Sequence, residues 1–388
     1  MTALRIENEG RVQWVDTARC IGIFLVILGH VNFEPIFGYS ISNWIYSFHM
    51  PLFFFLSGLA QKKGSLAESI KKATIQLLIP YFVFYILTFM WFIAVSVLRH
   101  PEIYPNRFET ILKAFLGLLI ADGYHTRISL MANVPLWFCV GLFWCKFVFA
   151  IFENSTHGKN RNFAHFALCL FFLVLAFFCK KICIPHFEEI LVGEIEIKRA
   201  IRFIPFSLQT LTLSYPIFFA GVCMKEKLFS NSSGTSKKAK KILVMLSCLL
   251  VSIFVVPIND RIDMNGANFG NDIFLFLVGS FCGIAFIYEI SVLISPLPRF
   301  FSFLGKESLV ILASHSITTS LLFAFTKRFF RHLLNEHDAN LCSFPLAIFI
   351  SAISLFLCAI PCFVVSKYFP WILGRSGSCK VGFVENSK

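Results

Sequence analysis

Long apolar runs dominate this chain and predict membrane-spanning helices. An α-helix crosses a bilayer with about 17 to 25 mainly apolar residues. We count ten such runs, without the alternation of apolar and polar residues that is typical of a membrane β-barrel. The predicted spans lie near 14–33, 41–61, 75–98, 133–152, 163–184, 204–223, 241–258, 270–294, 307–326 and 343–368.

The pattern therefore predicts an all-α integral membrane protein. We expect one transmembrane domain over 1–388, a bundle of about ten helices from about 14 to 368, without a soluble domain. The stretch 108–121 is also apolar but short, and it predicts an interfacial or re-entrant helix.

Composition supports this fold class. The chain is 57% hydrophobic with a mean hydropathy of +0.73, more apolar than one soluble core of this size could hide. The net charge of +13 comes from short basic clusters between apolar runs, not from a basic domain. This distribution favours membrane orientation and an anionic ligand, and it argues against nucleic acid as a partner.

The thirteen cysteines favour neither disulfides nor a metal site. Most stand singly in apolar runs, and no CxxC pair occurs, so we interpret them as small buried hydrophobic residues and expect no metal. Examples are Cys20, Cys139, Cys145, Cys169 and Cys282. The first apolar run carries charges and has no cleavage site after it, so it does not resemble a signal peptide.

Basic residues fall in alternate loops, which predicts the orientation. The loops near 62–72, 159–161, 225–241 and 299–306 are rich in Lys and Arg, whereas the first opposite loop carries Glu34 and neither Lys nor Arg. Because positive residues stay on the cytoplasmic side, we expect both termini there, in a multi-pass protein of the cell (plasma or inner) membrane.

Three polar residues in the first span are the strongest chemical signal. Arg19 and His30 are eleven residues apart, which is about three helical turns and roughly 16 Å, so they share a helix face. Asp16, three residues before Arg19, can pair with its guanidinium. Ionisable groups in hydrocarbon indicate a functional site, although an interfacial anchor would also explain Arg19.

Two more histidines are predicted at a similar depth. His49 lies seven or eight residues below the outer end of the second span, and His315 lies about eight residues into a late span. A neutral histidine can act as a general base. A structural alternative, in which each ring bonds a helix carbonyl, stays open for both.

Small and basic residues follow the second span. Ser57 could bond a ligand or its own helix, and Gly58 would allow a close backbone approach. The nearby lysines suit a phosphate-bearing ligand, and ordinary positive-inside anchoring explains them equally well. These lysines are Lys62, Lys63, Lys71 and Lys72.

Several motifs, in order, resemble the membrane acyltransferase 3 family. VDTARCIGIFLVILGH is similar to the family's first span, in which a basic residue and a histidine are separated by ten residues, as Arg19 and His30 are. FHMPLFFFLSGLAQKKG, KKATIQLLIPYF, VPLWF and LGKESLVILASH resemble later segments. Within the family the chain looks closest to sugar O-acetylases of the fucose 4-O-acetylase-like type.

The resemblance implies transfer of an acetyl group from acetyl-CoA, as co-substrate, to a hydroxyl of a cell-surface or lipid-linked glycan. The expected catalytic residues are His30, as general base or acyl carrier, Arg19 and Asp16, which would hold Arg19. The donor would contact Arg19, Ser57, Gly58 and the four lysines. The expected substrate contacts are His49, Asp122, His125, Arg127, Asn133, Trp137 and His315.

Two rival functions remain open at this level. A transporter or flippase of a glycan would also need polar residues in its spans, but we see no inverted repeat of the kind many transporters have. The second rival function is an acyltransferase that acts on a lipid or a small molecule. The bilayer and coenzyme A are the remaining expected partners, and a homo-oligomer is compatible with the sequence.

Overall fold

The all-α fold class is confirmed. The structure, a computed structural model, shows a helix at each of the ten predicted spans. It describes residues 12–36, 38–100, 102–121, 130–156, 158–178, 205–232, 238–260, 262–331, 334 and 342–375.

The helices follow one another with short connections. They are α1 (Gln13–His30), α2 (Ile41–Leu59), α3 (Leu66–Ala73), α4 (Ile79–Phe92), α5 (Arg107–Ile120), α6 (Trp137–Ser155), α7 (Lys159–Phe178), α10 (Leu211–Ser232), α11 (Lys238–Asn259), α12 (Ile273–Ile294), α13 (Arg299–Lys306), α14 (Ser308–Phe329) and α15 (Phe344–Tyr368). Single π-helical turns at Thr74–Leu78 and Ile93–Val97 continue α3 and α4, and 3₁₀ turns lie at Val134–Leu136, Pro205–Thr210 and Pro370–Leu373. The strands β1 (Ile262–Asp263) and β2 (Asn268–Phe269) form a small antiparallel hairpin.

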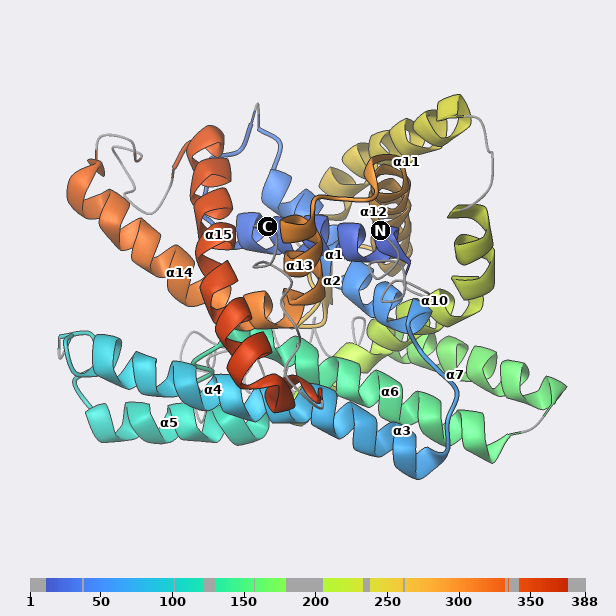
Figure 1. The fold of residues 1–388 in the computed structure, drawn as a ribbon, viewed down its shortest axis with the longest axis horizontal. Coiled ribbons are helices and arrows are strands. Elements are labelled where there is room, and N and C mark those ends of the chain that lie inside the picture. Colours follow the sequence, from blue (N-terminus) through green and yellow to red (C-terminus); the bar gives the residue numbers. More distant parts are fainter. Residues whose placement is uncertain are drawn as a thin grey trace, which may run out of the picture.

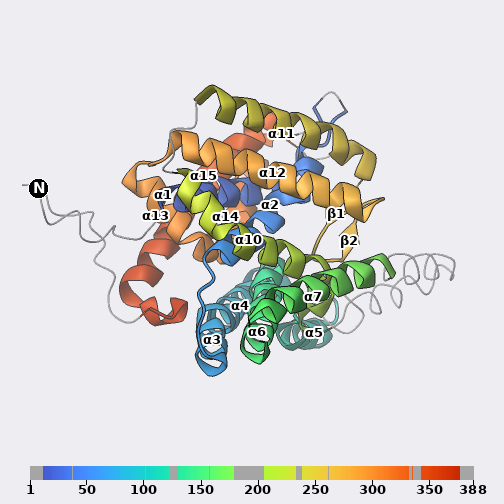
Figure 2. The same cartoon turned by 90° about the vertical axis from the view of Figure 1, so that its right-hand side faces the viewer.

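Helices α1 and α2 lie at the centre of the bundle. In the described part of the chain, eight helical segments are long and apolar enough to cross a membrane, and α1 and α2 are not among them because polar residues lower their hydropathy. Instead they are enclosed by protein. Helix α1 packs against α2, α12, α13, α14 and α15, while α2 also packs against α10 and α11 (Figure 2).

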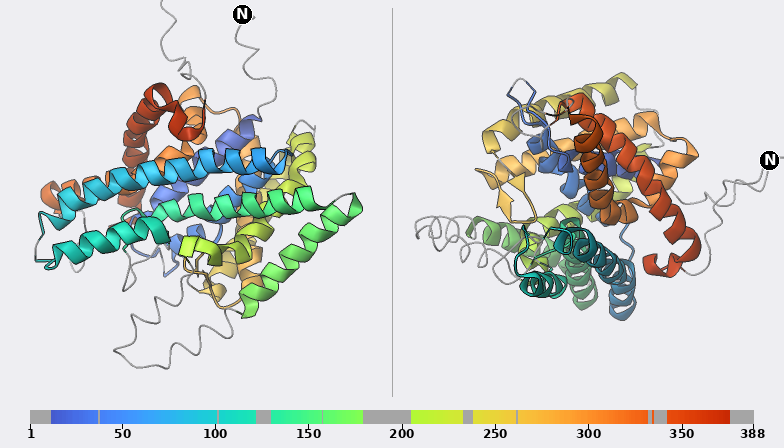
Figure 3. Two further views of the ribbon diagram at one scale, coloured as in Figure 1. Left: turned by 90° about the horizontal axis from the view of Figure 1, so that it is seen from below. Right: turned by 90° about the vertical axis from the view of Figure 1, so that its left-hand side faces the viewer.

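A second group of helices lies along one side of this centre. Helices α3 and α4 follow one another in one long rod, and α5 and α6 run alongside it (Figures 1 and 3). Helix α5 has 14 residues, about 21 Å, and is too short to cross a bilayer core of about 30 Å. The hydroxyls of Tyr81 and Tyr85 donate to carbonyls of α5, at Leu118 (2.7 Å) and Ala114 (2.7 Å), and thereby hold this helix against α4.

A proline shapes α2 where His49 lies. Pro51 has no backbone N–H, so the carbonyl of Ser47 loses its usual partner four residues later. The hydroxyl of Ser280, on α12, donates to this carbonyl at 2.7 Å. A neighbouring helix thus satisfies the group that the proline frees, which allows a proline inside a membrane helix.

The cysteines are free thiols in the described chain. Cys20, Cys139 and Cys145 are buried, and Cys169 and Cys282 are half-buried. They fill space between helices, in agreement with the interpretation from the sequence.

Helices α2 and α10 approach each other closely at two glycines. A Cβ atom at Gly58 would overlap the carbonyl oxygen of Phe218, and one at Gly221 would overlap that of Phe55. The two glycines thus allow contact of backbone with backbone, as small residues do at other membrane helix interfaces.

We expect Gly58→Ala to destabilise the fold. Its methyl group has no space against the Phe218 carbonyl, so the helices must separate, at a cost of about 1–3 kcal/mol. Thermal unfolding of the purified protein in detergent measures the loss. Gly279→Ala is the matched control, because its Cβ would meet the nearest atom at an ordinary 3.6 Å. Equal stability of the two variants would contradict this packing.

Candidate active site

A basic cavity opens at the end of the bundle where α1 begins and α2 ends. Its volume is about 540 Å³, and it lies between α1, α2, α3, α6 and the start of α14. Two acidic residues line it, Glu68 and Glu307. Its basic lining residues are Arg19, Lys62, Lys63, Lys72, Lys146, Lys306 and Arg375. This excess of positive charge suits an anionic ligand.

The predicted pairing of Asp16 with Arg19 is present. The Oδ1 atom of Asp16 lies 4.0 Å from Nη1 of Arg19, one turn along α1. Asp16 is buried, whereas Arg19 reaches the cavity. Asp16 therefore contacts the guanidinium from the protein side, and Arg19 still faces the cavity.

The expected donor contacts are divided between the cavity and other surfaces. Ser57, Lys62, Lys63 and Lys72 line the cavity, as Arg19 does. Gly58 faces α10. Lys71 is exposed and does not belong to the lining, although its neighbour Lys72 does.

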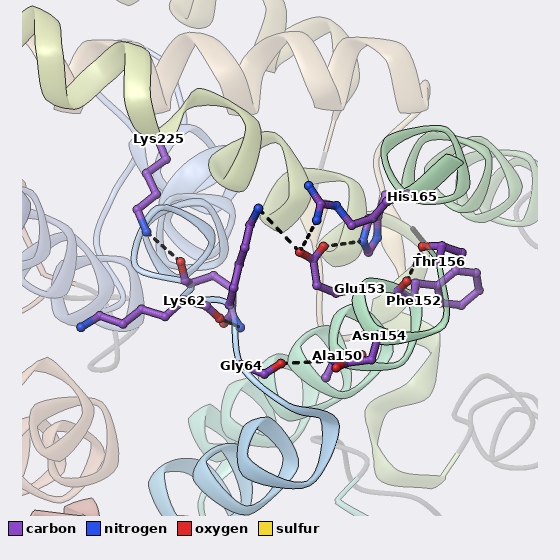
Figure 4. Close-up of polar contacts among 12 residues, drawn as sticks. Lys62, Gly64, Ala150, Phe152, Glu153, Asn154, Thr156, His165 and Lys225 are labelled. Atoms are coloured by element: carbon purple, nitrogen blue, oxygen red, sulfur yellow. Dashed lines mark hydrogen bonds and ion pairs between the residues drawn. The ribbon is translucent and has the colours of Figure 1, made fainter. Parts of the chain in front are cut away.

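The loop that carries Lys62 and Lys63 is fixed by its neighbours (Figure 4). Lys225 of α10 donates to the carbonyl of Gln61 at 2.8 Å, and Asn154 of α6 donates to that of Gly64 at 3.3 Å.

Glu153 of α6 is the acidic centre beside this loop (Figure 4). Its carboxylate lies 3.2 Å from Arg161, 3.5 Å from His165 and 3.9 Å from Lys63. These contacts connect the cavity rim to the start of α7.

The inner end of the cavity is apolar. Its lining there includes Ile23, one turn beyond Arg19 along α1, together with Met50 of α2 and Leu312 of α14. None of the described histidines belongs to the lining. Two of these apolar residues are close to histidines along the chain. Met50 follows His49 directly, and Leu312 precedes His315 by three residues.

Three histidines meet beyond this apolar end. The ring of His30, at the end of α1, lies 5.1 Å from that of His315 and 6.5 Å from that of His49, measured between ring centroids. His49 and His315 are buried, and His30 is exposed. The convergence predicted from three separate spans is therefore present.

Hydrogen bonds fix the tautomer of each ring. The Nδ1 atoms of His30, His49 and His315 lie 2.7, 2.9 and 2.9 Å from the carbonyl oxygens of Val26, Ile45 and Leu312. A carbonyl only accepts, so Nδ1 carries the proton and the neutral ring leaves a lone pair on Nε2. A bond to a helix carbonyl, the structural interpretation, is therefore compatible with a role as general base. With the proton held on Nδ1, Nε2 is free to accept another one.

The remaining predicted substrate contacts surround this cluster only in part. Asn133 is buried, and its Nδ2 donates to the carbonyl of Ala313, at 2.8 Å, two residues before His315. Trp137 is buried and packs against Phe54. Asp122, His125 and Arg127 lie outside the described residues.

The structure adds residues that the sequence reasoning missed. Tyr46 lies beside His30 and His49, at centroid distances of 5.8 and 4.9 Å, and its position three residues before His49 was the available signal. Lys146 was visible as a lone lysine in an apolar run.

Glu307 and Arg375 were also missed. Oε1 of Glu307 lies 2.6 Å from Nη1 of Arg375, and no sequence pattern connects them. In the described residues, no group of three or more His, Cys, Asp or Glu side chains is arranged to hold a metal ion.

Fold and site together define a polytopic membrane protein with a basic internal cavity next to a histidine cluster. A family profile described as an acyltransferase domain matches residues 12–364, nearly the whole chain. The chain therefore belongs to the membrane acyltransferase 3 family, as its motifs predicted. No significant match was found among curated proteins or among solved structures.

We expect Arg375→Met to destabilise the protein by about 2 kcal/mol, because it leaves the buried Glu307 carboxylate without its charged partner. The double variant Glu307→Gln/Arg375→Met should recover much of this loss, since it removes the isolated charge. Thermal unfolding of all variants, with Arg328→Met on the exposed face of α14 as control, measures the coupling. A double variant no more stable than Arg375→Met alone would contradict the pair's role.

Proposed function

We propose that this protein is a membrane O-acetyltransferase that moves an acetyl group from acetyl-CoA to a hydroxyl of a cell-surface or lipid-linked glycan. The observation that carries the proposal is the arrangement along α1, with Arg19 in the basic cavity and His30 in the histidine cluster. Family membership supports acyl transfer over transport. The acetyl group, the donor and the acceptor are the proposed parts, as is the fucose 4-O-acetylase-like type.

Coenzyme A suits the cavity by charge and by length. Its phosphates would bind among the basic lining residues, on the side that the loop charges predict to be cytoplasmic. Its pantetheine arm would extend along α1, over the roughly 16 Å between Arg19 and His30. The thioester would then reach the histidine cluster from one side of the membrane and the acceptor hydroxyl from the other.

In one mechanism His30 is the general base. Its Nε2 takes the proton of the acceptor hydroxyl while the oxygen attacks the thioester carbonyl. The C–S bond then breaks, and the proton passes from the imidazolium to the leaving thiolate. In the neutral ring, the hydrogen bond from Nδ1–H to the carbonyl of Val26 leaves the lone pair on Nε2, ready to accept this proton.

In the other mechanism His30 carries the acetyl group. Nε2 attacks the thioester carbonyl, coenzyme A leaves as the thiolate, and an acetyl-imidazolium remains, because Nδ1 keeps its proton. The acceptor hydroxyl then attacks this carbonyl and releases the free ring. His49 and His315 are close enough to take up the hydroxyl proton in this second step.

We expect His30→Ala to abolish acetyl transfer while leaving membrane insertion intact. A general base contributes about 10²–10⁴-fold, so any remaining rate should be at least about 100-fold lower. The measurement is transfer of labelled acetyl from acetyl-CoA to a glycan acceptor by the purified protein.

His100→Ala is the matched control, because His100 is exposed and lies away from the cavity. Full activity of His30→Ala would overturn the proposal. Labelled acetyl retained on the wild-type protein without acceptor, and absent from His30→Ala, would identify the acyl-carrier mechanism.

Neighbouring lysines offer a second test, of donor binding. Lys72→Met should raise the KM for acetyl-CoA about tenfold, since it removes one charged contact to a phosphate. Lys71→Met removes the same charge from the same helix but outside the cavity, and should leave the KM unchanged. Equal effects of the two would mean that only the general positive potential matters, and would argue against this cavity as the donor site.

A further inference from the structure

Lys146 is a charged residue at an unusual depth. It lies nine residues from either end of α6, in a segment apolar enough to cross the membrane. A lysine at such a position is costly unless it pairs with an opposite charge or faces a wet cavity. Lys146 faces the basic cavity and is half-buried.

The surroundings of Lys146 do not neutralise it. Its Nζ donates to the neutral Oε1 of Gln61 at 3.2 Å, and no carboxylate pairs with it in the described part of the chain. The nearby charges of Lys72 and Arg19 have the same sign and act on it unfavourably. Arg19 and Lys146 are half-buried, and Lys72, which lines the same cavity, is exposed. An anion bound among these like charges would relieve their repulsion.

Gln61 positions the ammonium group. Its carbonyl is held by Lys225 at 2.8 Å (Figure 4), and its side-chain oxygen accepts from Lys146. This bond fixes the Lys146 ammonium beside Gln61, and both residues line the cavity.

We propose that Lys146, together with Arg19, forms an inner subsite that binds the pyrophosphate of the acyl donor. This inference rests on the proposed function. Arg19 and Lys146 are half-buried, whereas Lys62 and Lys63, in the connecting segment after α2, are exposed at the rim. In coenzyme A the pyrophosphate lies between the pantetheine arm and the nucleotide, so it enters deeper than the 3′-phosphate. The inner cations therefore match the pyrophosphate, and the rim cations match the 3′-phosphate.

The test is equilibrium binding of coenzyme A and of 3′-dephospho-coenzyme A to the purified protein in phosphatidylcholine nanodiscs. Lys146→Met should weaken both ligands by the same factor, about tenfold, because both carry the pyrophosphate. Lys146→Arg keeps the charge and should lose less. Lys240→Met is the matched control, because Lys240 is exposed at the start of α11. This variant should bind both ligands like the wild type.

Three results would overturn the inference. The first is unchanged binding to Lys146→Met, provided that the variant unfolds at the wild-type temperature. The second is a loss confined to coenzyme A, which would assign Lys146 to the 3′-phosphate. The third is a Lys146→Met variant that binds coenzyme A normally but no longer retains phosphatidylglycerol, which the wild type retains from anionic nanodiscs. This result would make the site a lipid headgroup site.

Acetyl transfer, measured separately, distinguishes this inference from the function on which it rests. A wild-type protein that binds coenzyme A through Lys146 but transfers no acetyl group would overturn the proposed function alone. A wild-type protein that binds no coenzyme A overturns both.

Discussion

The structure depends on the cost of placing charge in hydrocarbon. Asp16, Arg19 and Lys146 would each be costly against lipid, so the helices that carry them turn these residues inward. This explains why α1 and α2, which fall outside the set of helices apolar enough to span a membrane alone, are enclosed by others. The more apolar outer helices face lipid, and the polar residues share one interior.

Regular helix geometry then sets the distances on which the chemistry depends. Along α1 the eleven residues from Arg19 to His30 fix a separation of about 16 Å without any loop to adjust it. On α2 the proline break, satisfied by Ser280, lies beside His49. Each histidine ring is held by its own helix carbonyl, so the cluster needs no additional partner to orient it.

Much of this arrangement was predictable because it is local. Ten helices follow from apolar run length, and the Asp16–Arg19 pair follows from spacing on one helix. Contacts between distant segments were not predictable, because a single sequence contains no distance between helices. Arg375 follows the last long helix yet pairs with Glu307, and Lys146 gives no sign in the sequence of which residues it faces. Gly58 suggested a close approach, but only the structure identifies α10 as the partner.

The apolar end of the cavity serves a purpose of its own. A continuous polar path from Lys62 to the exposed His30 would connect the two sides of the membrane and let ions through. Ile23, Met50 and Leu312 are apolar lining residues of the cavity, and the described histidines lie outside its lining. Their side chains are aliphatic, and methionine in particular adapts its shape to a neighbour. Under the proposed function, the thioester arm would displace such side chains more easily than a hydrated ion, because desolvating its neutral amides costs less than desolvating a charge. The acyl group would then pass while the barrier stays closed to ions.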